Sequence, residues 1–128
     1  MDKNFSIEIK GMRETINYLA EKNLAIQDAS DKAVFQSALM VEAEVKASIA
    51  GQRSEKRSVD TGRFLSSVWT KHTQKYVASI EPMVDYGIYL EYGTSKMQGR
   101  YHFRNSLNRM RDKIPAEFNT EIKSEVRD

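Results

Sequence analysis

Cysteine is absent from this 128-residue chain, which excludes disulfide bonds, thiol nucleophiles and cysteine-ligated zinc. The absence fits a protein made in a reducing cytoplasm. Histidine is scarce as well. His72 and His102 lie far apart in sequence, and neither has a nucleophile or a second ligand at a recognisable spacing. Each is therefore expected to be a packed or a surface residue without a catalytic role.

Other signatures of catalysis are also missing. The sequence contains no phosphate-binding glycine loop and no acidic loop of the calcium-binding kind, so no metal and no cofactor is expected. Glu81, Asp85 and Glu91 could pair for acid–base chemistry, but among 18 acidic residues such a triplet is expected by chance. We therefore expect a protein that is not an enzyme.

Long apolar runs are missing too. No stretch approaches the roughly 18 apolar residues of a membrane span, and the opening MDKNFSIEIK does not resemble a signal peptide. A composition of 40% apolar and 30% charged residues is typical of a folded, soluble protein. The length favours a single domain over residues 1–128, made in the cytoplasm and with no membrane partner.

The net charge of +2 is unevenly distributed. Residues 1–50 carry six basic and eight acidic side chains, residues 51–113 carry twelve and six, and residues 114–128 carry two and four. A basic middle can contact nucleic acid, including phage DNA without sequence preference, or it can dock on an acidic surface of a neighbouring copy. A solvated face is the commonest explanation, and all three alternatives stay open here.

The first part of the chain predicts one short strand and two helices. Alternating apolar and polar residues over 5–9 are typical of a half-buried strand. One apolar helical face predicts a short helix over 12–22, and a stronger stripe over 34–49 predicts a long one. Whether the two helices continue through residues 23–29 stays open.

The ends of the long helix have their own signals. Ser30 or Asp31 could cap its start, since their side-chain oxygens accept hydrogen bonds from backbone N–H groups. Gly51 stands where a helix C-terminus favours glycine.

Residues 51–62, GQRSEKRSVDTG, have no periodic apolar set and predict an exposed loop. Arg53, Lys56 and Arg57 make the loop basic. Loops of this length are usually functional or disordered. It is therefore either a binding loop that becomes ordered on assembly or a flexible connector.

The middle of the chain predicts a hairpin followed by a short helix. Residues 68–73 and 76–80 are rich in β-branched and aromatic side chains, and Gln74-Lys75 could form the turn between them. Residues 86–93 suggest a short helix that ends at glycine.

The last third carries an apolar stripe over residues 103–126 that predicts helix almost to the C-terminus. Pro115 removes one helical hydrogen bond, so we expect a kink there, or a break with Pro115 in the first turn of a second helix. Together the elements predict an α+β fold, in which a long N-terminal helical segment and a C-terminal helix pack on a small antiparallel sheet.

Two motifs carry a family resemblance. They are VDTGRFLSSV at 59–68 and YGIYLEYGTSKMQGRYHFRNSL at 86–107. In this order, and after a long helix, they resemble the head–tail joining, neck or tail-completion family of long-tailed phages, and are similar to the minor tail protein Z of phage lambda. The segment 99–107 departs from the family pattern, because Gly-Arg-Tyr-His-Phe and Arg-Asn-Ser-Leu replace its Arg-Pro-Phe and Arg-Pro-Ala-Leu.

The resemblance implies a virion structural protein at the head–tail junction. Such a protein would join an oligomeric ring of its own copies and would bind other neck, head-completion and tail proteins without turnover. The alternative is a basic nucleic-acid-binding module of the phage or its host, and an enzyme ranks third.

Within the motifs, local chemistry suggests separate roles. Asp60 or Thr61 could cap a helix that opens at residue 62. Tyr89 and Tyr92 offer large apolar bodies with polar tips, which suit interfaces. These residues could equally hold the monomer together, and a ring subunit needs both kinds of contact.

Glu91 has an acidic charge that Arg63 or Arg100 could pair with, within the chain or across subunits. The interface residues that we expect are Arg53, Lys56, Arg57, Asp60, Thr61, Arg63, Tyr89, Glu91, Tyr92 and Arg100.

Overall fold

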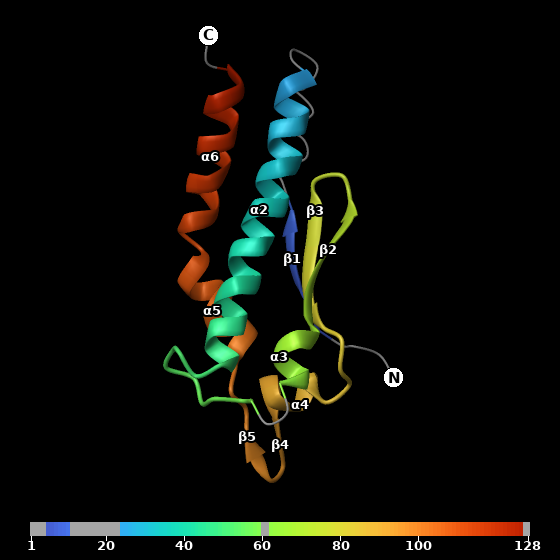
Figure 1. Ribbon diagram of the computed structural model, residues 1–128, viewed down its shortest axis with the longest axis vertical. Coiled ribbons are helices and arrows are strands. Elements are labelled where there is room, and N and C mark those ends of the chain that lie inside the picture. The colour runs from blue at the N-terminus through green and yellow to red at the C-terminus, as the bar shows by residue number, and fades with distance from the viewer. Residues whose placement is uncertain (1–4, 11–23, 60–61, 127–128) are drawn as a thin grey trace.

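The computed structural model describes residues 5–10, 24–59 and 62–126. One long helix, α2, lies between a three-stranded antiparallel sheet and two consecutive C-terminal helices (Figure 1). This arrangement confirms the predicted α+β fold. The elements of this arrangement are α2 (Leu24–Ile49), β1 (Ile7–Lys10), β2 (Val68–Gln74), β3 (Val77–Pro82), α5 (His102–Met110) and α6 (Lys113–Val126).

The sheet has the strand order β1-β3-β2, so β3 is central. Ile7 pairs with Ile80 and Val68 pairs with Pro82, and all four side chains are buried. The two-residue period predicted for the first strand is confirmed, because Ile7 and Ile9 are buried while Glu8 between them is exposed.

The β2–β3 turn is tied to α2 by one carboxylate. Asp31 Oδ1 accepts a hydrogen bond from the backbone N–H of Tyr76 at 2.7 Å and lies 2.8 Å from His72 Nε2. Tyr76 adopts φ 67°, so the turn lies one residue later than predicted. The prediction that Ser30 or Asp31 caps the helix is wrong, because α2 begins at Leu24 and both lie inside it.

The C-terminus of α2 ends as predicted. Gly51 has φ 87°, and its N–H donates to Ser48 O at 3.1 Å. The N–H of Gln52 donates to Ala47 O at 2.9 Å. This pair of bonds is a Schellman motif, which favours glycine because other residues rarely adopt a positive φ.

The C-terminal stripe forms two helices, α5 and α6, that run antiparallel to α2 (Figure 1). They are separated at Arg111 and Asp112. Pro115 is the third residue of α6 and lies in its first turn. Backbone N–H groups in the first turn form no hydrogen bond within the helix, so a proline there costs none. The predicted break is confirmed, and Pro115 occupies the position that the second alternative required.

Short elements cluster at one end of the molecule (Figure 1). The short helix predicted over 86–93 is confirmed, and Gly93 ends it with φ 87°. A Cβ atom at Gly93 would lie 2.6 Å from Met97 O, so glycine permits a tight hairpin that the sequence analysis did not predict. The elements at this end are α3 (Arg63–Ser67), α4 (Gly87–Tyr92), β4 (Gly93–Thr94) and β5 (Met97–Gln98).

Some predictions fall outside the described residues. The short helix expected over 12–22 is one, and the caps expected from Asp60 and Thr61 are the others. Helix α2 is continuous through residues 24–29, which answers part of the question about its N-terminal extent. Among the described helices, none is both long enough and apolar enough to cross a bilayer.

The core lies between α2 and the sheet and extends to α3 and α5. The buried valines and isoleucine of α2 pack in this core, and Phe103 of α5 packs against them. The large side chains at its centre are Val34, Val41, Val45, Ile49, Phe64, Val68, Ile80 and Phe103.

Truncating the centre of this core should be costly. We expect Ile80→Ala to lower the free energy of unfolding by about 2–5 kcal/mol, because it leaves a cavity in the central strand. Met83→Ala, at an exposed position just beyond the same strand, should change it by about 0.5 kcal/mol or less. Urea denaturation followed by circular dichroism measures both. Equal losses would show that the core does not centre on β3.

Candidate interaction site

Glu55 is a buried carboxylate in the loop between α2 and α3, and several donors converge on it. Arg109 of α5 donates from Nη1 to Oε2 and from Nη2 to Oε1, both at 2.9 Å. Asn105 Nδ2 and Ser54 Oγ each donate to Oε2 at 3.0 Å, and Ser48 Oγ donates to Oε1. A carboxylate removed from water needs such donors, because an unpaired buried charge carries a large desolvation penalty.

A second buried carboxylate, Glu44 of α2, extends this cluster. Arg53 donates to it from Nε at 2.6 Å and from Nη2 at 3.1 Å. Arg109 also donates from Nε to Glu44 Oε2 at 2.6 Å, so its guanidinium bridges Glu44 and Glu55. Two cations and two anions alternate, which keeps the cluster neutral. Arg53 was expected at an interface, but its charge is paired inside the protomer.

The pKa values of both carboxylates follow from these contacts. Hydrogen bonding and charge from Arg53, and then from Arg109, hold the pKa of Glu44 below its ordinary value against the opposing effect of burial. Burial alone would raise the pKa of Glu55, but hydrogen bonds led by those from Arg109 and Ser48 hold it far below its ordinary value. Both groups are therefore ionised at neutral pH.

A directed chain of hydrogen bonds runs from the surface to Glu55. Arg100 can only donate, and its Nη1 lies 2.7 Å from Ser58 Oγ. Ser58 Oγ is 2.7 Å from His102 Nε2, and Ser48 Oγ is 2.7 Å from His102 Nδ1. The Ser48 hydroxyl proton goes to Glu55, because a carboxylate can only accept. The ring therefore donates from Nδ1 to Ser48. Because burial lowers the pKa of His102 to about 4, the ring is neutral at pH 7, and Nε2 accepts from Ser58.

One of the two histidines is packed in the interior and the other lies on the surface. His102 is completely buried, and both its nitrogens are bonded to serines. His72 is an exposed side chain of β2 next to Asp31. Among the described residues, no group of three His, Asp or Glu side chains could hold a metal ion.

Glu91 of α4 is buried and caps the N-terminus of α5. Its Oε1 accepts from the backbone N–H of Phe103 and its Oε2 from that of Arg104, both at 2.9 Å. A carboxylate here satisfies helix N–H groups and faces the positive end of the helix dipole. Tyr101 precedes the helix with φ 55° and supplies no side-chain cap, so Glu91 takes that role. Burial raises the pKa of Glu91, and the two backbone hydrogen bonds oppose this rise.

This placement differs from the expectation that Glu91 pairs with Arg63 or Arg100. Backbone hydrogen bonds join residues 90–91 to residues 100–101 and bring α4 to the start of α5. The Glu91 carboxylate is thereby directed at the helix N-terminus and is only 2% exposed.

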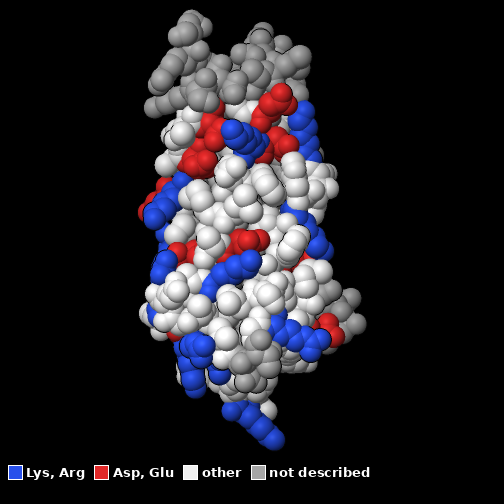
Figure 2. Space-filling model, viewed as in Figure 1, with Lys and Arg blue, Asp and Glu red and all other residues white. Residues whose placement is uncertain are grey.

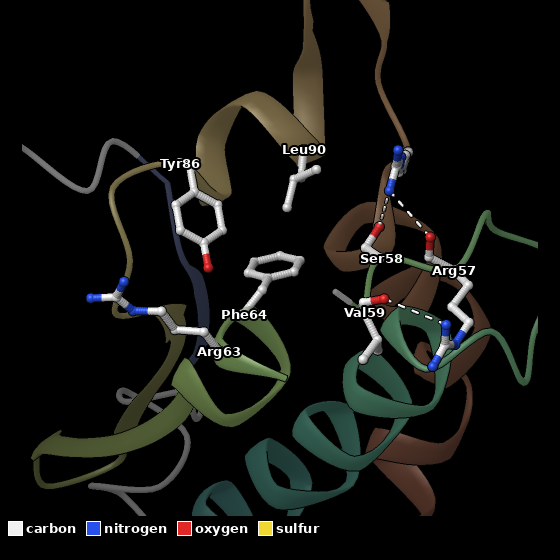
Figure 3. Close-up of a pocket in the computed structure, with 8 residues that line it drawn as sticks. Arg57, Ser58, Val59, Arg63, Phe64, Tyr86 and Leu90 are labelled. Atoms are coloured by element: carbon white, nitrogen blue, oxygen red, sulfur yellow. Dashed lines mark hydrogen bonds between the residues drawn. The ribbon is translucent and has the colours of Figure 1, made fainter. Parts of the chain in front are cut away.

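A cavity of about 410 Å³ opens beside this network, at the end formed by α3 and α4 (Figure 3). Phe64 lies at its centre, with Tyr86 on one side and Ser58 on the other (Figure 3). The Arg100 guanidinium is held by Ser58 Oγ and by the carbonyl of Arg57 at 3.2 Å. The described lining residues are Arg57, Ser58, Val59, Arg63, Phe64, Tyr86, Leu90 and Arg100.

The remaining predicted interface residues lie mainly on the surface of this end. Lys56, Arg57 and Arg63 are exposed, as are Tyr89 and Tyr92, at 48% and 56% of their area. Lys and Arg side chains outnumber acidic ones there (Figure 2). The structure thus brings Arg57, Arg63 and Arg100 together around one cavity, whereas it pairs Arg53 with the buried Glu44 and buries Glu91.

The buried cluster around Glu44 and Glu55 was not predicted from the sequence. Glu44 and Ser48 stand four positions apart on α2, and the three polar residues His102, Asn105 and Arg109 recur at helical spacing on α5. These polar stripes were the available signal. Their partners lie about 54 positions away along the chain, so spacing alone could not pair them.

Removing the bridging cation should destabilise the fold. We expect Arg109→Ala to lower the free energy of unfolding by about 3 kcal/mol, because it leaves two buried carboxylates without their shared partner. Arg111 is exposed and directly follows α5, so Arg111→Ala is the matched control. It should change the free energy of unfolding by about 0.5 kcal/mol or less. Urea denaturation measures both. A loss no larger than the control's would mean that the cluster adds nothing to stability.

The buried imidazole should make stability depend on pH. Burial lowers the pKa of His102 from 6.5 to about 4; Glu55 opposes the shift, and the arginine charges add to it. Between these values the unfolded chain binds a proton that the folded protein does not. The contribution of the neutral His102 to the free energy of unfolding is therefore complete above pH 6.5. It is lost as pH falls toward 4, by at most about 1.4 kcal/mol per pH unit.

His102→Gln should flatten the dependence of the unfolding free energy on pH between pH 6.5 and 5. Denaturation series at several pH values test this. Equal slopes in the variant and the wild type would contradict the burial of a neutral His102.

Comparison with known proteins now gives the geometry a context. A family model described as "Bacteriophage HK97-gp10, putative tail-component" matches residues 10–93. The matched stretch runs from the end of β1 through α4 and contains the first motif, at 59–68. No curated protein and no solved structure matches the chain. Because the family model covers more than half of the sequence, the chain belongs to the HK97 gp10-like family of bacteriophage tail components.

Proposed function

We propose that this chain is a structural subunit of a tailed-phage neck, which joins the head to the tail as part of an oligomeric ring. The observation that carries the proposal is membership of a phage tail-component family. Such a family implies a virion location, contacts with other phage structural proteins and a role without turnover. The motifs at 59–68 and 86–107, with their likeness to lambda minor tail protein Z, support a place at the head–tail junction.

The surface at the α3–α4 end fits the contacts that a ring subunit makes. Exposed tyrosines and arginines are enriched in protein interfaces, because they combine apolar area with polar tips. Here Tyr86, Tyr89 and Tyr92 are exposed on α4 or immediately before it, and Tyr86 lines the cavity together with the arginines. In a closed ring this surface would meet a different patch on the next copy, since head-to-tail contacts generate rings.

The ion pair between Arg53 and Glu44 removes Arg53 from the proposed interface. We assign it to Lys56, Arg57, Arg63, Tyr89 and Tyr92, with Asp60 and Thr61 in the same segment as Arg63. The loop at 51–62 would present its basic side chains from a fixed position, because Glu55 is hydrogen-bonded to α5. The whole chain would serve as one domain.

A phage carrying a deletion of this gene, complemented in trans, tests the proposal. We expect Tyr89→Ala and Lys56→Ala each to leave thermal unfolding nearly unchanged, since both side chains are exposed, and to lower the yield of infectious particles at least about tenfold. Free heads and tails should accumulate in electron micrographs. Lys113→Ala, an exposed lysine at the start of α6, is the control. Wild-type yields from all three variants would contradict the proposal.

The alternative, a basic nucleic-acid-binding module, rests on the cations at this end (Figure 2). It is weakened because Arg53 and Arg109 are already paired with buried carboxylates. Steeply salt-dependent DNA binding by purified protein that stays monomeric in sedimentation would favour it. Ring-sized oligomers without DNA binding would favour the neck.

A further inference from the structure

Helix α2 is apolar on two sides, and the fold covers only one of them fully. The sheet and α6 lie on either side of α2 (Figure 1), and the side chains that it turns toward them are buried. A second apolar stripe follows its outer face at three- and four-residue steps, where each residue is exposed or half-buried. The residues of this outer face are Phe35, Leu39, Ala43, Ala47 and, just after the helix, Ala50.

The two halves of the outer face differ in shape. The C-terminal half forms the floor of a shallow and mainly apolar groove of about 550 Å³ between α2 and α3. The N-terminal half carries the larger Phe35 and Leu39 where the other half has alanines. The described residues that line the groove are Ala43, Lys46, Ala47, Ala50, Gln52, Leu65 and Ser66.

Antiparallel pairing of two outer faces would match these shapes. In such a pair, residues at equal distances from the two-fold axis on opposite sides of it face each other. With the axis at the level of residue 44, Leu39 of one copy would enter the groove of the other between Ala47 and Ala50. The small side chains at the crossing would let the two helices approach closely.

The charges on this face are also complementary to themselves. Glu42 and Lys46 lie on one flank of the outer face and form an ion pair, with Oε2 and Nζ 3.4 Å apart. The same two-fold axis would place each Glu42 beside Lys46 of the second copy, so that the four charges alternate in sign. A nucleic acid would instead meet an acid next to this base. Shape and charge therefore both favour a second copy of this chain as the occupant.

We propose that two copies of this chain pair through the outer faces of α2, antiparallel and about a two-fold axis at the level of residue 44. Leu39 of each copy fills the groove of the other, and Glu42 and Lys46 form a four-charge cluster across the axis. This contact goes beyond the proposed ring, because it uses none of the residues assigned to the ring interface. The two contacts can therefore exist in the same assembly.

Charge reversal tests the pairing of Glu42 with Lys46. Glu42→Lys gives a copy with two lysines at the axis, and Lys46→Glu gives a copy with two glutamates. Each variant alone should dimerise at least about tenfold more weakly than the wild type, because both contacts across the axis become repulsive. An equimolar mixture of the two variants should dimerise again, since every contact then joins a lysine to a glutamate. Sedimentation equilibrium of the full-length proteins measures all four samples.

Cysteine cross-linking tests the antiparallel arrangement. The chain has no cysteine, so an introduced thiol is unique. Residue 43 lies next to the axis, and Ala43→Cys should form an intermolecular disulfide on oxidation with diamide. Residue 50 lies on the same face, but an antiparallel pair separates it from its equivalent by about 18 Å along the helices, at about 1.5 Å per residue, so Ala50→Cys should not cross-link. Ala116→Cys, at an exposed position of α6, is the control.

Several results would overturn the proposal. They are a wild-type protein that stays monomeric between about 1 and 100 µM, a mixture of charge-reversed variants that does not recover, and equal cross-linking at positions 43 and 50, which would indicate a parallel pair. Ring-sized particles that do not cross-link at position 43 would contradict it as well. Tyr89→Ala should leave the dimer unchanged while it impairs head–tail joining, so failure of this proposal is distinguishable from failure of the neck function.

Discussion

The buried contact between Glu55 and Arg109 is the interaction on which this end of the molecule depends. Glu55 lies in the loop between α2 and α3, and the guanidinium of Arg109 joins this loop to α5. Because the same guanidinium also reaches Glu44, the loop, α2 and α5 share one charge-balanced cluster. A buried pair of this kind often adds little net stability relative to an apolar core. Its effect here is to select one conformation for a loop with few apolar side chains.

The surface site inherits its geometry from that cluster. Ser48, His102 and Ser58 connect Glu55 to Arg100 by hydrogen bonds. Burial keeps the histidine neutral, so its ring can donate on one side and accept on the other. A cation at the mouth of the cavity is therefore positioned by a carboxylate in the interior.

Prediction from the sequence succeeded where the signal was local. The apolar stripe of α2, the glycine at its end and the break before Pro115 depend on neighbours within about one or two helical turns, and all three are confirmed. Ser30 and Asp31 were misassigned as caps, because a capping residue inside a longer helix has the same local sequence. Glu91 was predicted to pair with Arg63 or Arg100, since nothing in its surroundings in the sequence signals the helix start at His102.

Side-chain periodicity and special backbone positions are written in short stretches of sequence, and the α+β class and most of the element boundaries follow from them. Pairing between distant residues is not written there. From the sequence alone, Arg109 could pair with any of several carboxylates. Arg53 could likewise pair with any acidic residue or remain solvated. Packing of α5 against α2 placed Arg109 on Glu44, and the path of the loop after α2 placed Arg53 there. Burial then made those contacts obligatory, because a charge removed from water must be paired with the partner that the fold provides.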